Sequence, residues 1–209
     1  RQALRLDPDY VQAHFNLGNA LRALGQLREA TRHYEHAVRL KPGHLQALLN
    51  LSQVLLDTRQ LDQAARCCRQ ALRIKPDFAL ALVSLGAVLQ ALGRLVEAES
   101  HLRQAVQIDP SLAQAHVNLG NVLLALARLT EAEASYRQAL HIKPDYAPAR
   151  SNLANALRDQ GRLVEALVCS RQAQATQPGL ARAHSNLSSI LTHLSDFTEV
   201  VNASNRALE

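Results

Sequence analysis

The chain has 209 residues and a net charge of +5, and 47% of its residues are hydrophobic but only 3% are aromatic. Because leucine and alanine favour helices while strand-forming aromatic residues are scarce, an all-α protein is expected. No apolar run approaches the roughly 18 residues of a membrane span. The chain does not open on a signal peptide, so we expect a cytoplasmic protein without a membrane partner. The three cysteines offer no disulfide framework.

Prolines divide the chain into repeats of equal length. Six of the seven prolines are 34 residues apart: Pro8, Pro42, Pro76, Pro110, Pro144 and Pro178. A fixed period of this length is typical of proteins that repeat one supersecondary unit along the chain. Counting from the third residue after each proline gives repeats 1 to 6, over residues 11–44, 45–78, 79–112, 113–146, 147–180 and 181–209. The last repeat is cut short, and residues 1–10 match the end of a preceding repeat.

Each repeat is predicted to form two helices. Position 7 is always leucine, at Leu17, Leu51, Leu85, Leu119, Leu153 and Leu187. With Ala or aliphatic residues at positions 3, 10 and 11, this leucine forms the apolar stripe of a first helix. Glycine at position 15, as in Gly25, Gly93 and Gly161, is expected to end that helix in the left-handed conformation. The residue after each proline, such as Asp9 or Asp77, is expected to cap the next first helix. A second helix runs from position 17 to just before the next proline, which cannot continue it.

Small residues are expected where the two helices of a repeat meet. Position 8 carries only Gly, Ser or Ala, and position 20 is Ala in five repeats. Because helices approach closely only where side chains are small, these two positions are expected to face each other. All eight glycines lie at position 8, at position 15 or directly after a repeat proline, so none is left for a phosphate-binding loop.

This pattern resembles the tetratricopeptide repeat (TPR), and the resemblance covers the whole chain. It implies a right-handed TPR superhelix, an α-solenoid of helix-turn-helix repeats whose first helices line a concave groove. Such arrays usually bind peptides or partner proteins. The phrase Asn-Leu-Gly-Asn at residues 118–121 further resembles the repeats of O-linked N-acetylglucosamine transferases and their bacterial relatives. In those repeats, asparagines at position 6 form a ladder that binds the substrate main chain.

The asparagines are the sharpest functional signal in the residues themselves. Eight of the ten lie at positions 6 or 9 of a first helix: Asn16, Asn19, Asn50, Asn118, Asn121, Asn152, Asn155 and Asn186. Asparagine is a mediocre helix former, so helix propensity does not explain it there. The eight side chains share a stripe about 100° from the apolar one, where their amides could bond the main chain of an extended peptide. We therefore predict that they bind peptide. The alternative is that they bond the neighbouring repeat or water, and Ser84 interrupts the ladder in repeat 3.

The expected function is that of a non-catalytic module that binds an extended peptide or a segment of a partner protein in its groove. One alternative is the substrate-recognition part of a protein O-GlcNAc-type glycosyltransferase whose catalytic domain is missing from this chain. A second is a scaffold that assembles complexes through its convex face. The incomplete repeats at both ends would each expose an apolar face, so end-to-end self-association is also expected.

No catalytic, metal or cofactor site is predicted. His33 and His36 lie three residues apart on one helix, but no cysteine or carboxylate set completes a metal site. His14, His116 and His184 share position 4, which indicates a packing role. The basic residues lie mainly at helix ends and on second helices, and few aromatic side chains are present to stack bases, so no nucleic-acid partner is expected.

Overall fold

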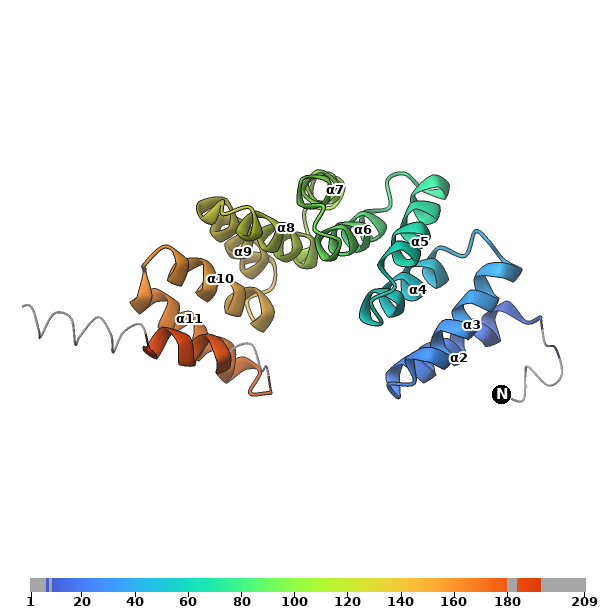
Figure 1. Ribbon diagram of the computed structural model, residues 1–209, viewed down its shortest axis with the longest axis horizontal. Helices are drawn as coiled ribbons and strands as arrows, with labels where there is room; N and C mark the ends of the chain where they lie inside the picture. Colours follow the sequence, from blue (N-terminus) through green and yellow to red (C-terminus); the bar gives the residue numbers. More distant parts are fainter. Residues whose placement is uncertain (1–6, 8, 180–183, 193–209) are drawn as a thin grey trace, which may run out of the picture. The chain divides into compact units, whose positions relative to one another are not determined.

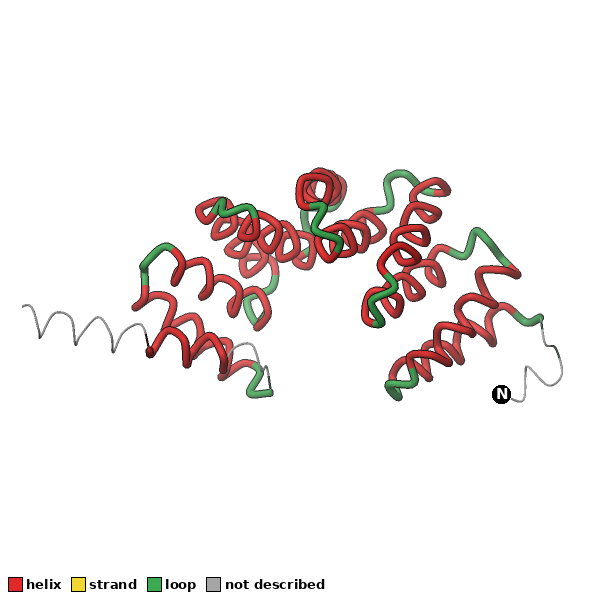
Figure 2. Tube along the Cα trace, in the orientation of Figure 1, coloured by secondary structure: helices red, strands yellow, loops and turns green. Residues whose placement is uncertain are grey.

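The computed structural model describes residues 7, 9–179 and 184–192, and these residues form α-helices joined by short turns, without a strand among them (Figures 1 and 2). The all-α fold of helical repeats is thereby confirmed. The chain divides into two compact units, residues 1–109 and 110–209. None of the helices in the described ranges is long and apolar enough to cross a membrane. The chain ends expected to self-associate include residues 1–6 and 193–209, which lie outside the described residues.

The described residues of the first unit form three antiparallel helix pairs. They are α2 (Val11–Ala23) with α3 (Leu27–Leu40), α4 (Leu45–Asp57) with α5 (Leu61–Ile74), and α6 (Ala79–Ala91) with α7 (Leu95–Ile108). Within this unit, α2 contacts α4 and α4 contacts α6, whereas each second helix packs on the first helix of the next pair. The first helices therefore form one layer and the second helices another.

The second unit has the same construction. Its helix pairs are α8 (Ala113–Ala125) with α9 (Leu129–Ile142) and α10 (Ala147–Asp159) with α11 (Leu163–Thr176), and residues 184–192 are also helical. Here α8 contacts α10, and α9 packs on α10.

The N-cap of each first helix lies one residue later than expected. Their N-cap positions are Tyr10, His44, Phe78, Leu112 and Tyr146, so the prediction of capping by Asp9, Asp77 and their equivalents is wrong. The reason is the turn that the proline sets. Backbone N–H groups of His44, Phe78 and Tyr146 donate to the carbonyl three residues earlier, at 3.0–3.2 Å. Proline thus occupies the second place of a β-turn and the residue after it the third, so the helix starts only after the turn.

The first helices end in the left-handed conformation, as predicted for the glycines at position 15. Gly25, Gly93 and Gly161 have φ values of 74°, 76° and 76°. Repeats 2 and 4 adopt the same conformation without glycine, at Arg59 with φ of 62° and Ala127 with φ of 59°. A side chain in this region is strained, because its Cβ comes too close to the following carbonyl oxygen.

Replacing Ala127 by glycine should therefore raise the free energy of unfolding, by about 0.5–1 kcal/mol, because relief of the left-handed strain exceeds the added entropy of the unfolded chain. Urea denaturation followed by circular dichroism measures the change. The control is Ala125→Gly, which lies in the last turn of α8 and should destabilise. An equal loss of stability in both variants would contradict the prediction.

The core follows the repeat. Alanines at positions 20 and 27 are fully buried in repeats 1 to 5, and so is the side chain at position 24. Leu51, Leu85, Leu119 and Leu153 are buried as expected. Leu17 was also expected to be buried but is only half-buried, because no helix among the described residues packs against α2 on its N-terminal side.

The small residue at position 8 makes its closest contact with position 24 and not, as expected, with the alanine at position 20. A Cβ atom added to Gly18 would lie 2.7 Å from the ring of Tyr34, and one added to Gly120 would lie 2.6 Å from the ring of Tyr136. The repeats with Ser52 or Ala154 at position 8 have a small side chain, Cys68 or Ser170, at position 24. Positions 8 and 24 therefore share one volume within each helix pair.

Candidate peptide-binding face

The eight asparagines lie on the first helices, as predicted, but their exposure differs. Asn16 is exposed, four are half-buried (Asn19, Asn50, Asn121 and Asn155), and three are buried (Asn118, Asn152 and Asn186). The most buried, Asn152, is only 4% exposed. A side chain so enclosed has to satisfy its hydrogen bonds mainly within the protein.

In repeats 1 and 4, the asparagine at position 9 accepts two hydrogen bonds, one from its own repeat and one from the next repeat. The Tyr34 hydroxyl donates to Oδ1 of Asn19 at 2.8 Å, and Nδ2 of Asn50 donates to the same oxygen at 2.8 Å. This arrangement recurs in the second unit, where Asn121 accepts from Tyr136 at 2.9 Å and from Asn152 at 2.7 Å. One amide oxygen thus ties the second helix of its own repeat to the first helix of the next.

Repeat 5 lacks the tyrosine of this bridge. Ser170 stands at position 24, and Oδ1 of Asn155 and Oγ of Ser170 are both buried without a hydrogen-bond partner in the described part of the chain. Asn186 is directed elsewhere, because its Nδ2 donates to the carbonyl oxygen and to Oγ of Ser151, each at 2.9 Å. The asparagine at position 6 still joins two repeats here, but by a different route.

Glutamines at position 2 extend the asparagine row, which the sequence reasoning missed. Gln12, Gln46 and Gln114 each donate from Nε2 to Oδ1 of the asparagine one turn later, at 2.7–3.3 Å. Their recurrence at one repeat position in three repeats was a signal in the sequence. The hydroxyl of Tyr146 also donates to the side-chain oxygen of Gln114.

Repeat 3 interrupts the polar row, as Ser84 had indicated. Position 2 is Leu80, which is 45% exposed, and the Ser84 hydroxyl donates back to the Leu80 carbonyl oxygen at 2.9 Å. Position 9 is Ala87, which carries no polar group. The first-helix face of α6 therefore offers an apolar surface between the amides of α4 and the end of its unit.

The ion pairs of the second helices have structural roles. Glu133 on α9 is only 8% exposed and accepts from Arg162 at 2.9 Å and from Arg137 at 2.7 Å. Burial alone would raise the pKa of Glu133, but hydrogen bonds from Gln160 and Arg162 and the charge of Arg137 bring it below its ordinary value. Since Gln160 and Arg162 belong to the turn between α10 and α11, this cluster joins repeats 4 and 5.

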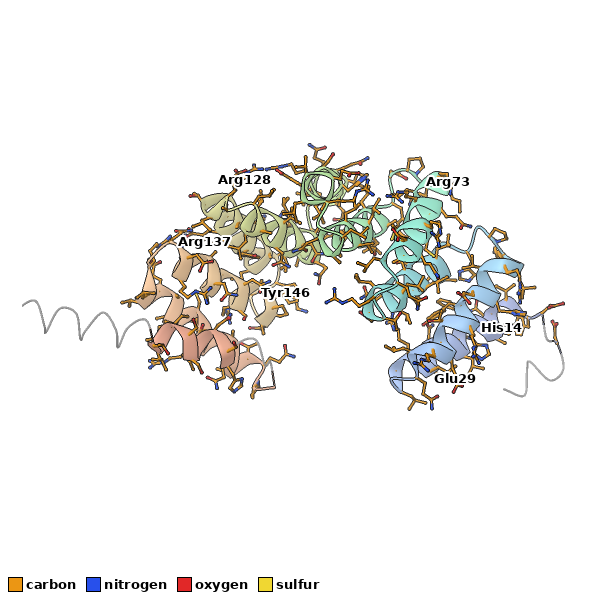
Figure 3. The ribbon with its side chains drawn as sticks, in the orientation of Figure 1. His14, Glu29, Arg73, Arg128, Arg137 and Tyr146 are labelled. Carbon is orange, nitrogen blue, oxygen red and sulfur yellow. The ribbon has the colours of Figure 1, made fainter. Side chains whose placement is uncertain are left out.

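The histidines and cysteines that could suggest a metal or redox site are packed within the protein. His14 is buried, stacks on His36 with ring centroids 4.0 Å apart and lies 2.9 Å from His33 between Nδ1 atoms (Figure 3 marks His14). Within the described residues, no group of three or more His, Cys, Asp or Glu side chains could hold a metal ion. Burial raises the pKa of Cys67 and of Cys68 to about 11, so both remain protonated thiols near neutral pH.

Over residues 3–209 the chain matches the family described as the C-terminal domain of cilia and flagella-associated protein 70. No curated protein matches it. Among solved structures, the chain is similar to TTC0263, a thermophilic TPR protein of Thermus thermophilus. The identity is 28% and the TM-score 0.78, over 87% of this chain and 99% of that one.

Two further solved structures are similar at lower identity. One is YrrB, a TPR protein with an unusual peptide-binding site, at 22% identity and a TM-score of 0.59, over 88% of this chain and 95% of that chain. The other belongs to the APC/C hetero-tetramer Cut9-Hcn1, at 18% identity and a TM-score of 0.84, over 92% of this chain and 38% of that chain. At these identities both support the fold alone.

Proposed function

This chain belongs to the family of the TPR-containing C-terminal domain of cilia and flagella-associated protein 70, and we propose that its first-helix face binds an extended segment of a partner protein. TPR proteins are generally non-catalytic interaction modules. The observation that carries the proposal is the side-chain amides on the first helices of each unit. Gln and Asn at positions 2 and 6 bond each other in repeats 1 and 2 of the first unit, where the apolar face of repeat 3 follows them, and in repeat 4 of the second unit.

Side-chain amides suit the recognition of a main chain. Each carries two N–H donors and an oxygen with two acceptor sites, so one bond to a neighbouring residue leaves further capacity. The exposed Asn16 accepts from Gln12 in the same helix, and the bridge of Asn19, Tyr34 and Asn50 does not include it. An extended segment bound through such groups would tolerate many sequences, and Leu80 would favour an apolar side chain opposite repeat 3.

The buried members of the row give a poor test of binding, since replacing Asn152 also removes a bond between repeats. Two other changes separate the roles. Asn16→Ala removes an exposed amide, and Ser84→Asn adds one where the row is interrupted. Each amide contact with a ligand contributes about 0.5–1.5 kcal/mol, so Asn16→Ala should weaken binding and Ser84→Asn should strengthen it, each by about two- to tenfold.

The probes are peptides selected on the wild-type chain from a random phage-displayed library, with affinities measured by fluorescence anisotropy. The matched control is Ser100→Asn, which makes the same substitution at an exposed position of α7 on the second-helix layer. It should leave affinity unchanged. Recovery of no peptide, or equal affinities for the wild type, Asn16→Ala and Ser84→Asn, would contradict the proposal.

The two alternative functions predict different results in the same experiment. If the chain selects substrates for a glycosyltransferase, the recovered peptides should share a serine or threonine at a constant place. If it acts as a scaffold through the second helices, binding should be lost on changing those helices and should survive every change on the first.

A further inference from the structure

A pocket on the second-helix side of the first unit has the chemistry of a separate binding site. It has a volume of about 590 Å³ and is lined by Arg69, Leu72 and Arg73 of α5, Leu85 of α6 and His101 of α7. Side chains of the second helices α5 and α7 line the pocket together, and Leu85 of the first-helix layer lines it as well. We propose that this pocket binds an acidic peptide segment that carries a large aliphatic side chain.

The positive charge comes from one ridge of arginines along α5. Arg66, Arg69 and Arg73 are three and four residues apart, so they share one face of the helix, and Figure 3 marks Arg73. None of the three forms an ion pair with another described residue. By contrast, Arg94, Arg128 and Arg162 at the starts of later second helices each hold a glutamate three residues on, at 2.6–2.7 Å.

Glu97, the acidic residue beside Arg69 and His101, does not neutralise this ridge. Glu97 on α7 lies close enough to Arg69 and His101 for its pKa to respond to both, but it is already held by Arg94 at 2.6 Å. Burial lowers the pKa of His101, so this side chain is neutral near pH 7. The charge available to a ligand therefore rests on the arginines. Guanidinium groups bind carboxylates through two parallel hydrogen bonds.

The remaining lining is apolar and matches an aliphatic side chain. Leu72 is half-buried and presents carbon surface to the pocket, whereas Leu85 lines it but is almost fully buried. No lining residue is a Phe, Tyr or Trp that could stack a base, which favours an acidic peptide over a nucleic acid.

A second pocket on the other side of the ridge extends the site. Its volume is about 300 Å³, and it is lined by Arg66, Arg73, Cys67, Leu51 and Leu55 and also by one carboxylate, Glu35 of α3. Because Arg73 lines both pockets, an acidic segment that crosses α5 could place an aliphatic side chain on each side of this arginine.

The test measures binding of a fluorescein-labelled peptide of alternating glutamate and leucine to the whole chain. Three other probes are a lysine–leucine peptide, a glutamate–serine peptide and a single-stranded oligonucleotide. Only the glutamate–leucine peptide should bind well, and raising the salt concentration should weaken its binding.

The double variant Arg69→Glu with Arg73→Glu should lower the affinity at least about tenfold, since two attractive charges become repulsive. Circular dichroism should show the wild-type helix content.

The matched control is Arg28→Glu with Arg32→Glu, which makes the same change in net charge on α3, away from the pocket. It should alter the affinity less than about twofold at moderate salt, because screening weakens distant surface charges. If the charge-reversed variant unfolds, Arg69→Gln with Arg73→Gln replaces it and should lower the affinity by about threefold. The first-helix variants Asn16→Ala and Ser84→Asn should bind this peptide normally, which separates the two proposed sites.

Equal losses in the α5 and α3 variants would overturn the proposal, and so would equal binding of the glutamate–serine peptide. Oligonucleotide binding that depends on Arg69 and Arg73 would overturn it in favour of a nucleic-acid site.

Discussion

Replacing Tyr136 by serine should lower the free energy of unfolding by about 3–5 kcal/mol, as expected for truncation of a fully buried aromatic side chain. Tyr136 is 0% exposed, its ring lies against Gly120, and its hydroxyl donates to Asn121. The change would therefore open a cavity and remove one of the two hydrogen bonds to the oxygen that also binds Asn152. Denaturation with urea, followed at a helical circular-dichroism band, measures the loss.

Tyr10→Ala is the control, because Tyr10 is 49% exposed and should contribute little by packing, and alanine, unlike serine, cannot cap α2 at this N-cap position. The double variant Gly120→Ala with Tyr136→Ser gives a sharper test. Alone, Gly120→Ala should cost about 1–3 kcal/mol, since the new methyl group overlaps the ring. After Tyr136→Ser it should cost nothing or restore stability, because repeat 5 combines Ala154 with Ser170. Strictly additive effects would contradict the shared volume of positions 8 and 24.

Leu119→Ala should lower the free energy of unfolding by about 2–5 kcal/mol. Leu119 is buried at position 7 of α8, where the apolar stripe meets the core. Leu24→Ala is the matched control, since Leu24 is 73% exposed at the end of α2 and its loss should change stability by less than about 0.5 kcal/mol. A loss below that same value for Leu119→Ala would show that position 7 does not belong to the core.

The repeat could be predicted because its local signals agree with one another. Leucine at position 7, alanine at positions 20 and 27 and glycine at position 15 each specify a helix face or a helix end, and the structure places them accordingly. The cap positions were missed because Asp9 and Asp77 suit both a helix cap and the third place of a proline turn. Only the turn hydrogen bonds, such as that from Phe78 to Lys75, distinguish the two.

The sequence could predict which helix face carries the asparagines but not which residues they contact. Periodicity places Asn19, Asn50 and Asn152 on one stripe, yet it does not tell which side chain bonds to each. The hydrogen bond from Tyr34 to Asn19 joins residues that are 15 apart in sequence and lie on two different helices, so it depends on how α2 and α3 pack. Whether the same amides also bind peptide stays a prediction.

The pairing of positions 8 and 24 also limits how such a chain can be rearranged. A recombination event between α10 and α11 that imported the second helix of repeat 4 would set a tyrosine ring against Ala154. The reciprocal product would set Ser170 against Gly120 and leave the space of the tyrosine ring unfilled. One product is overfilled and the other underfilled, so both should fold less stably than either parent. Whole helical hairpins are therefore the segments that can be duplicated or exchanged, and a crossover inside a hairpin needs a compensating change at the other position.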